Sequence, residues 1–424
     1  MAYPFNKTGE TATPIPSRPK WEVADIFRRY GREYLATHSV PTKQRSVMYD
    51  IEHCRKNGFG YHADICDNCG EVDIGHNSCR NRHCPKCQGI NQRKWVKARV
   101  KELLPVPYYH MVFTLPHRLF PVSLYNKALI YELLFSSASE TILTFGKDPN
   151  RLDGEMGFYG LLHSWGQNLW HHIHTHFIVP GGALKDDGTW NESKYGGRFL
   201  FPVQALSEVF TGKFIEGLKQ AYYDGKLTIP DDVEYLKDEL EFDNWVNRLV
   251  SKKWVVYCKS PLKSAEDVVK YIGRYTHRVA ISNYRLKSID NGEILFSYKD
   301  YKDKEIIWKE MTLEAPKFIK RFLWHVLPTG FHKIRHFGFL ANGKKKAKLE
   351  QISNLLSSES VEDVQAPKEE ETSEGFICKV CRKGILTPVY IVDRFGNYIV
   401  SNFSLLKYLN VARKSGQKRQ RQYL

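Results

Sequence analysis

Residues 172–179, HIHTHFIV, alternate polar and apolar side chains in the pattern of a β-strand with one buried face. Successive side chains of a strand point to opposite faces, so His172, His174 and His176 share one face. The pattern predicts a strand with core on one side and imidazoles, which suit Mn²⁺ and similar ions, on the other. A third metal ligand stays open among His172, His110, His163, Gln167 and Glu155.

Two tyrosines further along the chain, Tyr271 and Tyr275, lie four residues apart in a segment with helical spacing. Residues at i and i+4 are neighbours on a helix surface, so both hydroxyls would lie on one face. Such pairs more often pack in a core, and these gain weight only from the histidine strand. Together the two segments predict phosphodiester cleavage, in which a metal polarises the phosphate and a tyrosine oxygen attacks it.

The composition bounds the class of protein. A chain of 424 residues exceeds what one core usually supports, so two or three domains are expected. The formal net charge of +16 predicts a polyanionic partner, with nucleic acid leading. No apolar run reaches the ~18 residues of a membrane span, and the N-terminus has no apolar signal core. We therefore expect a soluble protein in a reducing cytoplasm, where the nine cysteines bind metal rather than form disulfides.

A cysteine-rich segment, residues 54–87, is too poor in aliphatic residues to build a core unaided. Two C-x-x-C pairs about fifteen residues apart predict one tetrahedral Zn²⁺ site made by Cys66, Cys69, Cys84 and Cys87. A second zinc is a hypothesis with Cys54, His62, Cys79 and His83 as its ligands. The pair Cys378 and Cys381 receives no metal role. DNA contacts are expected from Arg80, Arg82, Arg93 and Lys94.

Strand and helix patterns interleave, which predicts an α+β fold. Helices are expected near 120–145 and 155–170, and strands near 108–115, 253–258, 293–299 and 305–311. The expected domains are a helical arm (1–50), a zinc-binding domain (51–95), a catalytic domain (96–285) with a helical insertion at about 183–250, its C-terminal part (286–345), an acidic disordered linker (346–375), and a small Cys-pair segment with a basic tail (376–424).

Several ordered motifs in residues 50–345 carry a family resemblance. They are CDNCG, SCRNRHCPKCQ, HMVFTLPH, HIHTHFIVPGGAL, YIGRYTHRVAISN and RFLWHVLPTGFHKIRHFGFLAN. This set resembles the two-tyrosine rolling-circle transposases of the insertion-sequence-ninety-one type, which belong to the HUH endonucleases. Two residues depart from the family pattern: Thr175 replaces a bulky aliphatic residue, and Ile173 stands where Pro is frequent.

The resemblance implies a fold, a site and a mechanism. The catalytic domain would be an HUH domain, a central antiparallel sheet flanked by helices, with His174 and His176 as the metal pair and Tyr271 and Tyr275 as nucleophiles. Single-stranded DNA at element ends and targets would be nicked through a 5′-phosphotyrosine, with Mg²⁺ or Mn²⁺ at the catalytic site and structural Zn²⁺ elsewhere. Arg274 and Arg278 would hold phosphate. The implied location is the bacterial cytoplasm, in association with the nucleoid, and the oligomeric state stays open.

Three alternatives remain. A rolling-circle replication initiator or a conjugative relaxase would share the chemistry, although the zinc segment and the lack of a helicase motif favour a transposase. A zinc-containing DNA-binding regulator without catalysis would not need the complete histidine and tyrosine sets. In a metal hydrolase without covalent chemistry, the tyrosines would belong to the core.

Overall fold

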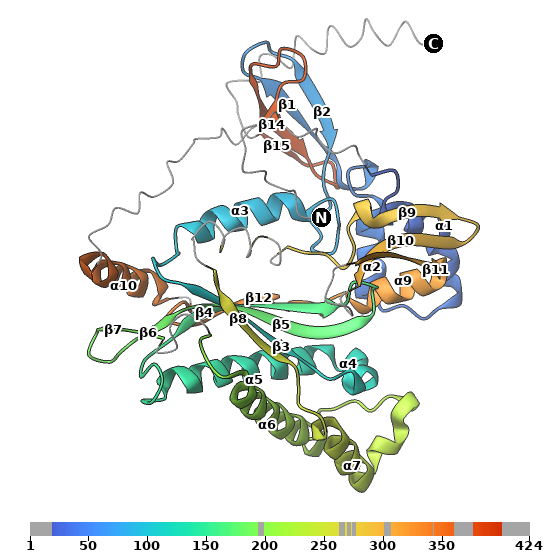
Figure 1. Ribbon diagram of the computed structural model, residues 1–424. Coiled ribbons are helices and arrows are strands. Elements are labelled where there is room, and N and C mark those ends of the chain that lie inside the picture. Colours follow the sequence, from blue (N-terminus) through green and yellow to red (C-terminus); the bar gives the residue numbers. More distant parts are fainter. Residues whose placement is uncertain are drawn as a thin grey trace, which may run out of the picture. The chain divides into compact units, whose positions relative to one another are not determined.

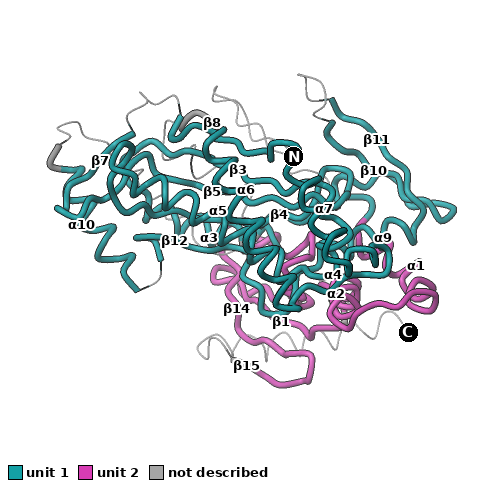
Figure 2. The backbone as a smooth tube through the Cα atoms, turned by 90° about the horizontal axis from the view of Figure 1, so that it is seen from below, with its two compact units in different colours: residues 1–21, 88–362 teal, residues 22–87, 363–424 magenta. Residues whose placement is uncertain are grey.

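The computed structural model describes residues 19–193, 199–262, 268, 273, 277–300, 307–341, 343–359 and 376–400. These divide into two units, one of residues 1–21 and 88–362 and the other of residues 22–87 and 363–424 (Figure 2). Within the described part of the chain, no helix has the length and apolar character needed to cross a membrane.

The centre of the first unit is an antiparallel sheet with strand order β12-β4-β5-β3-β8. Its strands are β3 (Tyr108–Thr114), β4 (Gly157–Trp165), β5 (His171–Pro180), β8 (Val256–Leu262) and β12 (Ile334–Gly338). The two strands beside β5 are β3 and β4, whose β-branched and aromatic side chains suit a sheet covered on both faces. The strand that carries the histidines therefore lies in the middle of the sheet.

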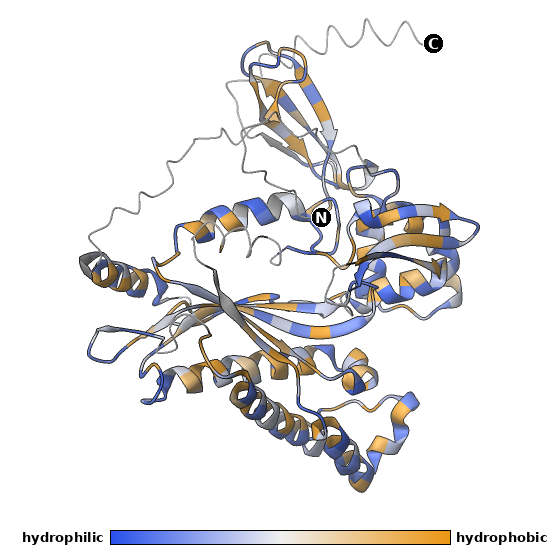
Figure 3. Cartoon of the chain, in the orientation of Figure 1, coloured by the Kyte–Doolittle hydropathy of each residue, from blue (hydrophilic) through white to orange (hydrophobic). Residues whose placement is uncertain are grey.

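One face of this sheet packs on helices. Figure 1 shows α5 (Lys127–Lys147) and α6 (Val203–Tyr223) beneath the sheet and α3 (Gln88–Val100) on the opposite side. Edge-to-face contacts join Phe113 of β3 to Phe177 of β5 at 5.6 Å and to Phe210 of α6 at 5.0 Å between ring centroids. Along α6, apolar and polar segments alternate, as expected for a helix with one packed face (Figure 3). The hydrophobic core thus lies between the sheet and the α5–α6 layer.

Shorter elements complete the first unit. A hairpin of β6 (Gly182–Leu184) and β7 (Trp190–Glu192) follows β5, and β9 (Leu286–Asp290), β10 (Glu293–Asp300) and β11 (Ile307–Glu314) form a separate antiparallel sheet. The remaining helices are α4 (Phe120–Tyr125), α7 (Glu239–Val250), α9 (Ala315–Trp324) and α10 (Lys345–Glu359), with 3₁₀ turns η2 (His117–Leu119), η3 (Asp231–Lys237) and η4 (Asn283–Arg285).

The second unit joins segments from both ends of the chain. Helices α1 (Val23–Thr37) and α2 (Thr42–Glu52) and the 3₁₀ turn η1 (Asn57–Phe59) precede β1 (Tyr61–Cys66) and β2 (Val72–His76), and the C-terminal strands are β13 (Phe376–Ile377), β14 (Ile385–Val392) and β15 (Tyr398–Val400). Strand β14 pairs with β1 along its length. Just before β1, Gly60 has φ +76°, and a Cβ there would clash with the Val392 carbonyl. The close approach of the two segments therefore requires glycine at this turn.

The predicted α+β class is confirmed, but three details of the expected organisation are corrected. Residues 155–170 contain strand β4 rather than a helix, since two-sided burial of the strand masks the alternation that would identify it. Helix α10 occupies the first half of the expected linker 346–375, and the rest of that segment lies outside the described residues. Strand β12, within the expected C-terminal part (286–345), forms an edge of the central sheet, so this sheet extends beyond residue 285.

Candidate active site and metal centres

The central sheet brings three histidines together. Strand β5 presents His174 and His176 on one face, and the register of β4 places His163 directly opposite His174. One ring nitrogen from each of the three lies within 4.8 Å of the others. The predicted strand therefore has the expected face, and its neighbour supplies a third imidazole.

Hydrogen bonds orient these rings. The Nδ1 of His174 lies 2.9 Å from the His172 carbonyl oxygen, to which it can donate, and that tautomer leaves the Nε2 lone pair available. The Nε2 of His176 lies 3.0 Å from the Nδ1 of His163. Nitrogens directed at one another in this way form a donor set that fits a divalent ion of the imidazole-binding class.

Burial keeps His174 and His176 neutral. It lowers the pKa of His174 to about 3, with the neighbouring His172 adding to the effect. The pKa of His176 falls well below its ordinary value of 6.5, first through burial and then through the charges of His163 and His174. The positive charge of Arg278 also lowers both values. A neutral imidazole is the form that binds metal, so His174 and His176 could serve as metal ligands at neutral pH.

The structure changes the choice of third ligand. The His163 ring joins His174 and His176, whereas the exposed His172 is not part of the group. Glu155 is likewise not part of the group. Of the five candidates for the third ligand, the strand register favours His163, because β4 pairs with β5 so that His163 lies opposite His174.

His110 on β3 contacts His176 through the ring nitrogen of His176 that does not face His163. Its Nε2 lies 2.8 Å from the Nδ1 of His176, and the two rings stack with centroids 5.1 Å apart. Such an outer partner sets the tautomer and orientation of a metal-ligating histidine. His110 is thus a positioning residue for His176.

Replacing His110 is expected to weaken metal binding without removing a ligand. His110→Phe keeps a stacked ring but loses the hydrogen bond, and Mn²⁺ affinity measured by titration calorimetry should fall roughly 10–100-fold. His110→Gln retains a polar group near His176 and should lose less. Equal affinities for wild type and His110→Phe would exclude this role.

The predicted nucleophiles Tyr271 and Tyr275, and Arg274 between them, lie outside the described residues. Two residues of the same segment are described. Val268 packs in a buried cluster with Tyr108 and Ile178, and Ile178 follows His176 by two positions on β5. The Gly273 carbonyl accepts a hydrogen bond from Gln92 of α3.

The nine cysteines include two groups of four, which the structure assembles in a different combination from the predicted one. Cys54, Cys79, Cys84 and Cys87 form one group, and Cys66, Cys69, Cys378 and Cys381 form the other. The predicted site of Cys66, Cys69, Cys84 and Cys87 is therefore wrong, as each C-x-x-C pair meets a different partner pair. The second predicted set is wrong in part, because Cys54 and Cys79 group with Cys84 and Cys87 rather than with His62 and His83.

The sulfur spacing fits zinc. Sγ–Sγ distances are 3.5 Å for Cys54–Cys87 and 3.6 Å for Cys79–Cys87 in the first group. In the second group they are 3.6 Å for Cys66–Cys381 and 3.7 Å for Cys69–Cys378. A tetrahedron with Zn–S bonds of ~2.3 Å has edges of about 3.8 Å. Both groups thus have the size of a Zn(Cys)₄ site.

A backbone donor favours the thiolate form of Cys381 in the second group. The N–H of Gly384 donates to the Cys381 sulfur at 3.3 Å, and this bond is the main reason that the pKa of Cys381 falls to about 6.

The two histidines of the second predicted set lie outside these groups. The Nδ1 of His62 is 2.9 Å from the Oδ1 of Asn77, and the backbone N–H of His83 donates to the side chain of Asn81. The hydrogen-bonding role of Asn77 is structural, since its amide also donates to the Val392 carbonyl of β14 at 2.7 Å.

The predicted DNA-contacting cations have varied exposure. Arg80 and Arg93 are exposed, Arg82 is half-buried, and the side chain of Lys94 lies outside the described set. Exposed Arg278 lies close enough to the active site for its charge to act on His174 and His176. A further cation was not foreseen: Lys333 lies 5.0 Å above the Trp165 ring, which stacks on His163, and donates to the Arg278 carbonyl at 2.9 Å.

Comparisons with known proteins agree with this arrangement. Residues 26–115 match the family "Transposase zinc-binding domain", and residues 157–348 match the family "Putative transposase". The chain is 45% identical over 385 residues to "Putative transposase y4qJ" of Sinorhizobium fredii, covering 88% of this chain and 96% of that one. It is 29% identical over 296 residues, 68% of each chain, to "Transposase for insertion sequence element IS801" of Pseudomonas savastanoi pv. phaseolicola. No solved structure matches. The chain belongs to the IS91 family of transposases, with an N-terminal zinc-binding domain.

Proposed function

We propose that this transposase nicks and rejoins single-stranded DNA at element ends through a 5′-phosphotyrosine intermediate. The observation that carries the proposal is the convergence of His163, His174 and His176 on one face of the central sheet, where burial keeps His174 and His176 neutral. A divalent ion, Mg²⁺ or Mn²⁺, would be held by these three residues and would polarise the scissile phosphate.

Cations beside the histidines would receive the DNA backbone. Arg278 is exposed, and its charge acts on His174 and His176. Lys333 is fixed nearby through its bond to the Arg278 carbonyl and its position over Trp165. Positive groups placed at the reacting phosphate stabilise the charge that develops on its oxygens.

Tyr271 and Tyr275 supply the nucleophiles in this proposal. A tyrosine oxygen forms a bond to phosphorus, the P–O3′ bond breaks, and the departing 3′ oxygen takes a proton. The second tyrosine can cut another strand, and attack by a free 3′-OH reverses a phosphotyrosine bond and joins DNA. Because the covalent link conserves the energy of the broken phosphodiester, no nucleotide cofactor is required.

The position of neighbouring residues supports the tyrosine assignment. Val268 contacts the buried cluster that contains Ile178, on the same strand as His174 and His176. Gly273, between the two tyrosines in sequence, is bonded to Gln92 of α3. The described parts of the segment thus belong to the layer that covers the histidine face of the sheet.

Other uses of the same chemistry are less well supported. A replication initiator or relaxase would need the same histidines, but both reported relatives are named as transposases, and one is assigned to an insertion sequence. A regulator without catalysis would not require three converging imidazoles.

A covalent adduct tests the proposal. The full chain is incubated with Mn²⁺ and a single-stranded oligonucleotide from its own element end, and denaturing gels reveal any protein–DNA adduct. Wild type should form the adduct, and the Tyr271→Phe, Tyr275→Phe double variant should form none, because phenylalanine has no oxygen nucleophile.

Tyr235→Phe is a matched control, since Tyr235 is 49% exposed on η3 in the helical insertion. It should form as much adduct as wild type. Strand cleavage that persists in the double variant would overturn the tyrosine assignment. Absence of cleavage by wild type on element-end DNA would overturn the proposed activity.

A further inference from the structure

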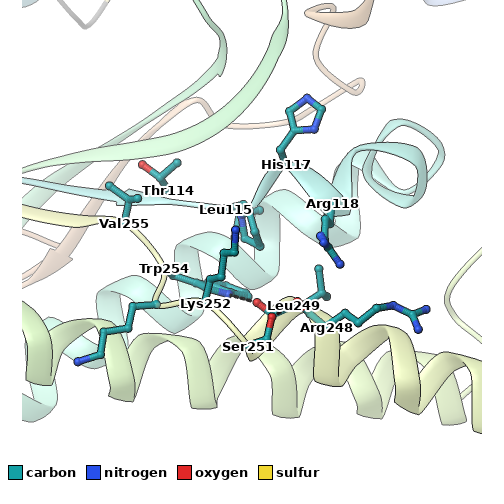
Figure 4. Close-up of a pocket in the computed structure, with 12 residues that line it drawn as sticks. Thr114, Leu115, His117, Arg118, Arg248, Leu249, Ser251, Lys252, Trp254 and Val255 are labelled. Atoms are coloured by element: carbon teal, nitrogen blue, oxygen red, sulfur yellow. Dashed lines mark hydrogen bonds between the residues drawn. The ribbon is translucent and has the colours of Figure 1, made fainter. Parts of the chain in front are cut away.

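A basic pocket of about 250 Å³ opens where β3 ends (Figure 4). It lies between the turn that follows β3 and the connection from α7 to β8, with Trp254 and Leu249 in its apolar wall. Its lining contains no acidic residue and includes four cations: Arg118, Arg248, Lys252 and Lys253.

Three of these charges are not neutralised. Lys253 approaches Glu208 at 3.9 Å, with both side chains highly exposed. Among the described residues, no carboxylate lies within 4.0 Å of Arg118, Arg248 or Lys252, all of which are exposed. A concave surface with uncompensated positive charge attracts an anion, and guanidinium groups match the oxygens of a phosphate.

The pocket adjoins the histidine site through a single residue. Thr114 lines the pocket and is the β3 residue that pairs with His174 on β5. Directly paired residues in an antiparallel sheet have Cα atoms about 4.5–5.5 Å apart, and their side chains share a face. The pocket lining thus includes the β3 residue that lies opposite His174 in the central sheet.

Aromatic rings lie beside the pocket, between it and the histidine site. His117 lines the pocket and accepts a hydrogen bond from the indole N–H of Trp170, and the two nearly parallel rings have centroids 5.8 Å apart and an interplanar angle of 10°. Phe120 stacks with both of these rings. Arg321 lies 5.0 Å above the Trp170 ring. Exposed or half-buried aromatic rings beside cations are the surface on which single-stranded DNA stacks its bases.

His172 connects these rings to the metal site. Its ring lies 4.8 Å from that of His174 between centroids, and it is also within electrostatic reach of His117. His172, exposed and outside the metal group, thus belongs to a continuous track from the histidine site to the pocket.

We propose that the pocket binds a backbone phosphate of the single-stranded DNA, adjacent to the nucleotide at the cleavage site, while a base stacks on the His117–Trp170 surface. This inference rests on the proposed cleavage of single-stranded DNA and adds a subsite that positions the strand. Arg118, Arg248 and Lys252 contact the phosphate, and Trp254 with Leu249 closes the apolar side.

Neutralising one phosphate at a time tests the subsite. A series of element-end oligonucleotides carries one uncharged methylphosphonate linkage each, and binding to the full chain is measured by fluorescence anisotropy at several salt concentrations. In wild type, one linkage near the cleavage site should weaken binding more than its neighbours do. In the triple variant Arg118→Gln, Arg248→Gln, Lys252→Gln, binding should fall at least about tenfold at low salt, and that linkage should no longer matter.

A matched triple variant controls for net charge. Lys213→Gln, Lys219→Gln, Lys237→Gln removes the same charge from ion-paired lysines of the helical insertion. It should keep the position-specific effect and retain more affinity than the pocket variant. In the pocket variant, the slope of log affinity against log salt should decrease by about 0.7 for each phosphate that the protein no longer neutralises.

The outcomes separate this inference from the proposed function. If wild type forms the covalent adduct but the pocket variant shows the same affinity and the same linkage profile, the subsite is excluded while cleavage stands. If wild type forms no adduct but its linkage profile depends on the pocket cations, the pocket binds DNA and the proposed cleavage fails.

Discussion

Protein purified without added zinc is expected to contain two zinc ions per chain. One would be held by Cys54, Cys79, Cys84 and Cys87, and the other by Cys66, Cys69, Cys378 and Cys381. The reason is geometric, since the Sγ–Sγ distances of 3.5–3.7 Å in the two groups match the edges of a zinc tetrahedron. Elemental analysis of the protein gives the number directly.

Variants of the second cysteine group should show how much its zinc ion stabilises the second unit. Cys378→Ser, Cys381→Ser should retain one zinc and lose the pairing of β14 with β1, which limited proteolysis would detect as new cleavage within residues 376–400. Structural zinc contributes on the order of 10–16 kcal/mol in zinc-finger peptides, so the effect on the second unit should be large. Cys258→Ser, which changes a cysteine of β8 outside both groups, should keep two ions.

A single zinc in wild-type protein would exclude one of the two sites. If that ion persisted in the Cys378→Ser, Cys381→Ser variant, the second group would be free thiols. If it disappeared, the first group would be the one without metal. The zinc content of the variant would therefore show which of the two cysteine groups lacks metal.

The strand that carries the histidines was predictable because its sequence pattern is local. Alternation over eight residues determined which side chains share a face, and the structure places His174 and His176 together as expected. The basic composition and the cysteine pairs likewise indicated a metal-containing DNA-binding protein, which the family comparisons confirm in its coarser form as a transposase with a zinc-binding domain.

The residues that other strands bring to the histidines were not predictable in the same way. His163 becomes a candidate ligand only through the register of β4 against β5, and the mostly buried residues of β4 were expected to form a helix. Short apolar segments do not distinguish a buried strand from a buried helix by periodicity alone.

The cysteine grouping failed for a different reason. Pairs that are close in sequence were assigned to one ion, yet Cys66 and Cys69 meet Cys378 and Cys381 through the pairing of β1 with β14. A signal was available, because Cys378 and Cys381 repeat the C-x-x-C spacing of Cys66 and Cys69 and each pair needs a second one to close a tetrahedron. An unpaired C-x-x-C in a reducing compartment is itself a reason to look for a distant partner.

The choice of His163 over His172 as third ligand predicts a large difference between two alanine variants. His163→Ala should lower Mn²⁺ affinity by more than the roughly 10–100-fold expected for an outer-shell residue such as His110, and the covalent adduct should fall below detection. His172→Ala should leave Mn²⁺ affinity within a few-fold of wild type, because the exposed ring is outside the metal group. Titration calorimetry on the DNA-free protein measures both affinities.

The same pair of variants also distinguishes metal binding from strand positioning. His172 contributes its carbonyl oxygen to His174, and alanine preserves that acceptor, so the orientation of the metal pair should survive the substitution. The Nδ1 of His163 lies 3.0 Å from the Nε2 of His176, and no other imidazole, cysteine or carboxylate of the described residues belongs to the group. Comparable losses of Mn²⁺ affinity in the two variants would contradict the assignment, and a greater loss in His172→Ala would transfer the third-ligand role to His172.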